Sequence, residues 1–141
     1  MKIAVDFDGT IVEHQFPEIG SELLFAIETL KELQKQKHQL VLWTFRSGQY
    51  LDDAVEYCRQ RGLEFYAVNK NYPEEEFTES ISRKINADLF IDDRNLGGFP
   101  GWQAVFEMVS NGTHLDPYSP NDDQSNAQSR DGFFSKLFKR H

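Results

Sequence analysis

Short apolar runs alternate with amphipathic segments along most of this chain, and this alternation constrains its fold more than any other feature. We expect strands over residues 1–5, 39–43, 63–68 and 87–91. Apolar residues recur at helical spacing over residues 21–33, 49–61 and 102–109. Strand, helix and strand in repetition predict right-handed crossovers and a parallel sheet. The expected fold class is therefore α/β, a Rossmann-like doubly wound parallel sheet with helices on both faces.

Polar side chains follow three of these apolar runs. They are Asp6 and Asp8 after the first run, Thr44 after the second, and Asp92 with Asp93 after the fourth. In a parallel sheet the carboxyl ends of the strands meet at one edge, and ligands bind there. We therefore expect these side chains to meet at a single site.

The first of these motifs has the form Asp-x-Asp-Gly. Asp6 and Asp8 share one face of the chain with Phe7 turned away, and Gly9 breaks the strand into a turn. Two carboxylates a few ångströms apart repel each other unless a cation holds them. The motif therefore indicates a Mg²⁺ site that includes a nucleophile. The same pattern is also common in surface turns, and the polar strand ends downstream favour the functional interpretation.

These residues resemble the signature of the haloacid dehalogenase superfamily of phosphohydrolases. The resemblance covers residues 1 to about 110, and its four elements occur in the expected order: residues 6–10, Thr44, Lys84, and Asp92 with Asp93. Within that superfamily the chain looks like the small capless hydrolases. The resemblance implies that the strand before Asp6 is central and that no cap domain covers the site.

The resemblance also implies roles around a bound metal ion. Asp6 attacks phosphorus and forms an aspartyl-phosphate. Mg²⁺ is held by the Asp6 side chain, the Asp8 backbone carbonyl and Asp92, while Asp93 orients the water around the ion. Asp8 protonates the leaving oxygen and then takes a proton from the attacking water. We expect the surroundings of Asp8 to favour its neutral form.

Two further residues are expected to contact the phosphoryl group. Thr44 donates a hydrogen bond to a phosphate oxygen, and Lys84 supplies positive charge to the phosphoryl oxygens and to Asp6. Each has a structural alternative. Threonine is common at strand ends, and the neighbouring Arg83 could serve in place of Lys84, or the pair could form a solvated surface.

Arg46, Arg94 and Asn69 are candidates for substrate binding. Both arginines adjoin a motif and can bind anions, although arginine is common on protein surfaces. Asn69 follows the third apolar run and is expected at the rim of the pocket. His14 could reach the site from the connection after the first strand, or it could be an exposed loop histidine.

The predicted function is that of an enzyme, a Mg²⁺-dependent phosphatase acting on a small phosphorylated metabolite such as a sugar phosphate or nucleotide. An uncovered site would also admit nucleic-acid ends or phosphoproteins, and a non-catalytic binding protein could keep the same fold. The formal net charge of −8 argues against nucleic acid as a partner. Without a cap, selectivity must come from loops, a neighbouring subunit or a large substrate.

We expect two regions in the chain. Residues 1–114 form the hydrolase domain, and residues 115–141 form a polar linker with a short basic amphipathic tail. The tail is expected to hang loose, to pack on a second copy in a homo-oligomer, or to touch a membrane surface weakly. A single cysteine, Cys58, the lack of a signal-peptide pattern and the lack of an apolar run of ~20 residues predict a cytoplasmic protein with no membrane span.

Overall fold

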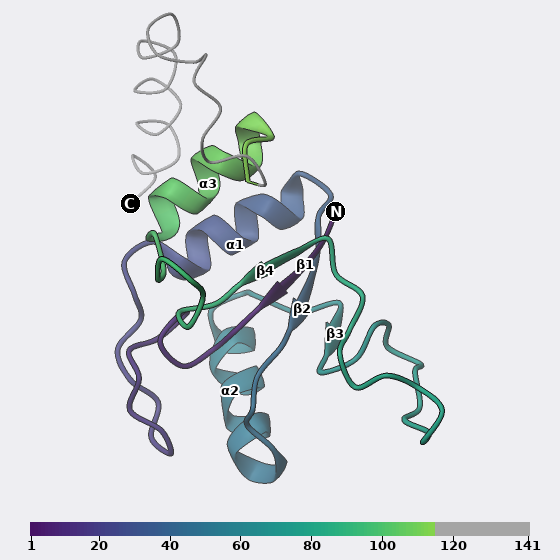
Figure 1. Cartoon of the computed structure of the whole chain (residues 1–141). Coiled ribbons are helices and arrows are strands. Elements are labelled where there is room, and N and C mark those ends of the chain that lie inside the picture. The colour runs from purple at the N-terminus through teal and green to yellow at the C-terminus, as the bar shows by residue number, and fades with distance from the viewer. Residues whose placement is uncertain (115–141) are drawn as a thin grey trace, which may run out of the picture.

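Residues 1–114, the part of the chain that the computed structural model describes, form four strands and three helices. The elements are β1 (Lys2–Val5), α1 (Ala26–Lys35), β2 (Gln39–Leu42), α2 (Gly48–Gln60), β3 (Ala67–Val68), β4 (Leu89–Ile91) and α3 (Trp102–Asn111) (Figure 1). None of the helices in this part is both long enough and apolar enough to cross a bilayer. The predicted linker and tail, residues 115–141, lie outside the described residues.

All four strands run parallel in one sheet, in the order β3-β2-β1-β4, which confirms the predicted α/β class. β1 is an interior strand, because Val5 is in register with Leu42 of β2 on one side and with Ile91 of β4 on the other. Such a strand needs apolar side chains on both faces, and Ile3, Ala4 and Val5 are all buried. The residues after β1 therefore lie in the middle of one sheet edge.

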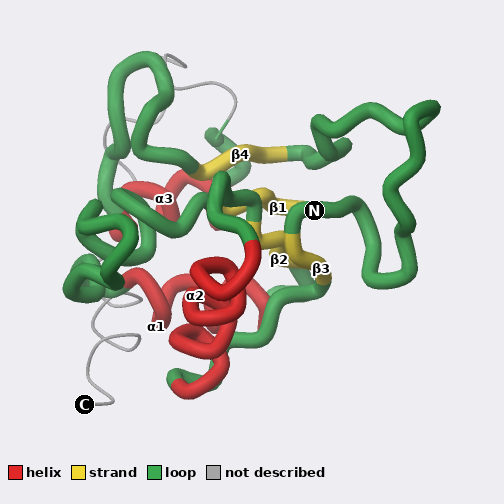
Figure 2. The backbone as a smooth tube through the Cα atoms, turned by 90° about the horizontal axis from the view of Figure 1, so that it is seen from below, coloured by secondary structure: helices red, strands yellow, loops and turns green. Residues whose placement is uncertain are grey.

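The two faces of the sheet are covered by different kinds of structure. Ile3 and Leu40 belong to the core formed with α1, α2 and α3, whereas Ala4 and Val41 pack beneath residues 69–88. Figure 2 shows the helices on one side of the strands and this long connection on the other. The prediction of helices on both faces is therefore not met in residues 1–114.

The handedness of the crossovers explains this arrangement. The chain moves from β1 to β2 to β3 in one direction across the sheet, so right-handed connections place α1 and α2 on the same face. The connection from β3 to β4 returns in the opposite direction and takes the other face. Residues 69–88 include Pro73 followed by three consecutive glutamates, and they form no helix.

Helix α1 begins at Ala26 rather than at Ser21 as predicted. Within residues 11–25, which we call the flap, the Glu13 N–H donates to the Ser21 carbonyl at 2.8 Å. This pairing uses backbone groups that a helix from Ser21 would need. Leu24, which lies within the segment of helical spacing over residues 21–33, is 75% exposed.

The substitution Thr29→Val is expected to stabilise the fold. Thr29 is fully buried in α1, and its Oγ1 has no hydrogen-bond partner among the described residues. Valine keeps the shape without the hydroxyl, so the free energy of unfolding should rise by about 1 kcal/mol in urea titrations. Thr78→Val is the control, because its exposed hydroxyl bonds to Ser80 at 2.9 Å and its removal should bring no gain. A less stable Thr29→Val protein would mean that the hydroxyl is paired.

Candidate functional site

The carboxyl ends of β1, β2 and β4 lie side by side because backbone pairing continues past the strands. The Asp6 N–H donates to the Ile91 carbonyl at 3.0 Å, and the Trp43 N–H donates to the Val5 carbonyl at 2.8 Å. A cavity of about 300 Å³ opens at this edge. It is lined by Asp6, Asp8, His14, Trp43, Thr44, Phe45, Asp92 and Arg94. The predicted edge is therefore the edge where a ligand has room.

Three carboxylates form a cluster at this edge. Oxygen atoms of Asp6, Asp92 and Asp93 all lie within 4.8 Å of one another. Oδ1 of Asp93 is buried and has no hydrogen-bond partner among residues 1–114. Three half-buried carboxylates at this spacing could hold a metal ion. Asp93, expected to act only on the water around the ion, lies in the same cluster as Asp92.

The electrostatics of the cluster favour a cation. Burial raises the pKa of the Asp6 carboxyl from 3.8 to about 8, although a hydrogen bond from the Phe7 backbone opposes the rise. The charges of Asp92 and Asp93 and a hydrogen bond to Asp93 are smaller contributions to the same rise. A bound cation would favour the ionised carboxylate. The cluster by itself therefore costs stability that a metal ion can restore.

Gly9 meets two requirements of the turn after β1. Its φ of 82° lies in the left-handed region that side chains other than glycine rarely adopt. A Cβ at this position would collide with Oδ2 of Asp93. The following residue, Thr10, accepts a hydrogen bond at its carbonyl from Nε1 of Trp102 at 2.8 Å. The absence of a side chain at Gly9 thus leaves space for the Asp93 carboxylate, and the hydrogen bond from Trp102 connects the turn to α3.

Asp8 is held apart from the cluster by Arg46. Nε of Arg46 donates to Oδ2 of Asp8 and Nη2 donates to Oδ1, both at 2.7 Å, and both side chains are fully buried. The guanidinium also donates to the carbonyls of Pro17, Glu18 and Tyr50 at 3.3, 2.9 and 3.3 Å. These bonds engage all five of its N–H groups. One side chain therefore joins the turn after β1, the flap and α2.

This ion pair corrects two sequence predictions. Arg46 is not a substrate-binding residue in this arrangement, because its guanidinium has no donor left and lies 5.1 Å from the centre of the Phe16 ring that covers it. Asp8 does not have the surroundings that we expected, because both of its carboxylate oxygens are bound by the buried Arg46 guanidinium.

Thr44 lines the cavity, as predicted, and Asn69 holds it there. Oδ1 of Asn69 accepts from the Thr44 N–H at 2.8 Å, and Oγ1 of Thr44 accepts from the Arg46 N–H at 3.2 Å. The second bond uses only a lone pair, so the Thr44 hydroxyl can still donate to a ligand. Asn69 was predicted to bind substrate, but its amide oxygen positions Thr44 instead.

The two predicted cations near β4 occupy different places. Arg94 lines the cavity, and its backbone N–H donates to Oδ1 of Asp92 at 2.8 Å. Lys84 is exposed, and its Nζ lies 5.5 Å from the centre of the Phe90 ring, on the face that residues 69–88 cover. Lys84 is not among the described residues that line the cavity. The structure does not bring Lys84 to the site, because the connection that carries it crosses the face opposite the helices.

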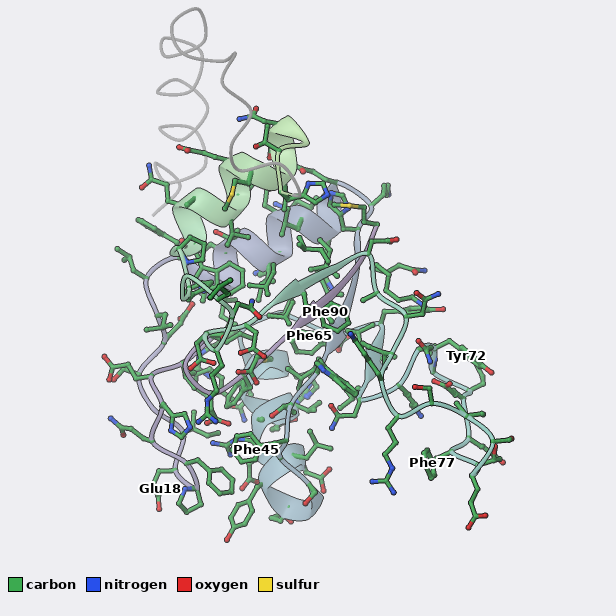
Figure 3. All side chains as sticks on the ribbon, in the orientation of Figure 1. Glu18, Phe45, Phe65, Tyr72, Phe77 and Phe90 are labelled. Atoms are coloured by element: carbon green, nitrogen blue, oxygen red, sulfur yellow. The ribbon has the colours of Figure 1, made fainter. Side chains whose placement is uncertain are left out.

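The aromatic part of the cavity was not found from the sequence. Trp43 and Phe45 flank Thr44 along the chain, and both line the cavity. Figure 3 shows Phe45 beyond the strand ends, on the same side of the molecule as Glu18 of the flap. The sequence feature that could have indicated it is the aromatic residue on each side of Thr44, at the polar end of a strand. His14 also lines the cavity, so the flap contributes to it.

Arg46→Lys is expected to destabilise the protein by about 3 kcal/mol, because a lysine cannot bind Asp8 bidentately and also reach the carbonyls. Thermal unfolding followed by circular dichroism measures this change. Arg59→Lys is the matched control, since its bidentate pair with Glu56 lies on the surface and should contribute little. Equal losses in the two variants would contradict the special role of the buried pair.

The raised pKa of Asp6 predicts that the metal-free protein loses stability as the pH rises. The carboxyl ionises near 3.8 in the unfolded chain and near 8 in the folded one, so the folded state holds more protons between these values. Stability from this group is complete below the lower value and is lost towards the upper one. Asp6→Asn should therefore increase the free energy of unfolding more at about pH 8 than at about pH 5. Urea titrations with a chelator test this, and a pH-independent difference would contradict it.

Comparison with known proteins places the chain beside one solved structure. No protein-family model matches the chain, and no curated protein does. The solved structure is that of a conserved protein coded by a locus of Bacteroides thetaiotaomicron, with 62% sequence identity and a TM-score of 0.76. The match covers 79% of this chain and 91% of that chain. The chain therefore belongs to the same family as this conserved Bacteroides thetaiotaomicron protein.

Proposed function

We propose that the protein is a Mg²⁺-dependent phosphatase of the haloacid dehalogenase type that hydrolyses the phosphate monoester of a small metabolite. The observation that carries this proposal is the cluster of Asp6, Asp92 and Asp93 at the end of an interior strand, beside a cavity. Clustered, half-buried carboxylates are costly unless a cation is bound among them. The same cavity presents Thr44 and Arg94, which are donors suited to phosphoryl oxygens.

Asp6 is the nucleophile in this proposal. Its carboxylate oxygen bonds to phosphorus while the bond from phosphorus to the alcohol oxygen breaks, which gives an aspartyl-phosphate. Water then attacks the phosphorus and releases inorganic phosphate and free Asp6. Asp6, Asp92 and Asp93, with the backbone carbonyl of Asp8, would hold Mg²⁺. The bound ion supplies charge that offsets the repulsion between carboxylate and phosphate.

Thr44 and Arg94 bind the phosphoryl oxygens. Asn69 fixes the backbone of Thr44, so the hydroxyl donates from a defined position. Arg94 is exposed at the cavity, and its guanidinium can bind two oxygens of a phosphate at once. It takes the role that the family resemblance gave to Lys84. Donors of this kind are effective when they are in place before charge develops.

Asp8 acts as the general base of the second step. The Arg46 guanidinium binds both oxygens of Asp8, and each oxygen keeps a lone pair after it binds the guanidinium. The carboxylate can therefore take a proton from the water that hydrolyses the intermediate. The leaving oxygen receives its proton from solvent. Phosphates with good leaving groups are accordingly the faster substrates.

Hydrolysis of ribose 5-phosphate and of an aryl phosphate, measured as released phosphate, tests this function. Wild-type activity should require Mg²⁺, disappear with a chelator and return when Mg²⁺ is restored. Asp6→Asn should abolish turnover of both substrates without changing the circular dichroism spectrum. Asp52→Asn, which alters an exposed carboxylate of α2, should keep wild-type activity. Retention of more than about a tenth of the activity in Asp6→Asn would remove Asp6 from this role.

A further inference from the structure

Three exposed aromatic side chains form a run of ring contacts that begins at the cavity, and we call Phe16, Phe45 and Tyr50 the aromatic rim. They come from the flap, the loop after β2 and α2, and they are 37%, 60% and 48% exposed, respectively. The rings of Phe16 and Phe45 meet edge to face with centroids 4.8 Å apart, and those of Phe16 and Tyr50 at 5.4 Å. Phe45 also lines the cavity beside Thr44, so the rim is continuous with the proposed reaction site.

Packing within the protein explains the position of only some of the aromatic residues in this rim. Phe16 covers the guanidinium of Arg46 and so has a structural role. Phe45 leaves more than half of its surface in water, although exposure of a phenyl ring to water is unfavourable. Trp43, on the other side of Thr44, lines the same cavity. Aromatic walls beside a phosphate-binding edge suit a ligand that has an anionic end and a planar apolar end.

We propose that the substrate is a nucleoside 5′-monophosphate whose base stacks on Phe45 while its phosphate lies against Thr44 and Arg94. This inference rests on the proposed phosphatase function and narrows it. The cavity of about 300 Å³ between the carboxylate cluster and the rim leaves room for the ribose. Every nucleobase can stack on an aromatic side chain, whichever base it is. The net charge of −8 disfavours a polynucleotide, whereas a single phosphate needs only the metal site and Arg94.

The test compares kcat/KM for adenosine 5′-monophosphate and ribose 5-phosphate, which share the same leaving oxygen, in the presence of Mg²⁺. Wild type should prefer the nucleotide by about tenfold or more. Phe45→Ala should remove most of this preference, mainly through KM for the nucleotide, and Phe45→Tyr, which keeps a ring, should retain it. Phe77→Ala is the matched control, because Phe77 is 61% exposed and lies on the other side of the molecule (Figure 3).

Two results would overturn the nucleotide assignment: equal kcat/KM values for the two substrates in wild type, or equal losses on both in Phe45→Ala. Release of phosphate from neither substrate would instead contradict the phosphatase function. In that case, calorimetric titration of both compounds into the Mg²⁺-treated protein tests nucleotide binding independently of catalysis. Tighter binding of adenosine 5′-monophosphate that Phe45→Ala weakens supports it, and equal or absent binding rejects it.

Discussion

The buried pair of Arg46 and Asp8 is the interaction on which the arrangement of the site depends. A buried charge is tolerated only when its partners satisfy it, and here both oxygens of Asp8 and every N–H of the guanidinium are engaged. The acceptors belong to the turn after β1, the flap and α2. These segments cannot separate without leaving a charged group unpaired. The pair therefore holds together the turn after β1 and the flap, which both line the cavity, and joins them to α2.

Beside this fully paired carboxylate, the site holds three carboxylates that have no cationic partner among the described residues. Asp6, Asp92 and Asp93 gather in a half-buried cluster, and burial raises the pKa of Asp6. Gly9 gives up side-chain contacts so that Asp93 has room. Such an arrangement is unfavourable for the fold alone, and binding sites commonly retain groups of this kind at some loss of stability. The buried apolar side chains of the parallel strands stabilise the fold and offset the stability lost at this cluster.

The mouth of the cavity is built from connections rather than from a separate domain. In residues 1–114 the flap supplies His14 and the loop after β2 supplies Phe45, while the Phe16 ring packs against the rings of Phe45 and Tyr50. Because Arg46 ties these segments together, the exposed rings are held on a fixed base. That these loops provide substrate selectivity, the first of the three sources that we expected, stays a prediction. Loops placed on a rigid scaffold commonly carry binding residues.

The apolar runs in the sequence predicted all four strands, although β3 covers only Ala67–Val68 of the predicted residues 63–68. The shared edge of parallel strands predicted that Asp6, Thr44 and Asp92 would meet. The sequence did not determine where the long cationic side chains go. Lys84 and Arg46 both lie near strand ends in the sequence, yet one rests on the far face of the sheet and the other is buried. Their positions depend on which face a connection crosses and on partners distant along the chain. The tertiary structure alone decides this, because a buried charge goes where its hydrogen bonds can be satisfied, and those partners come together only when the chain folds.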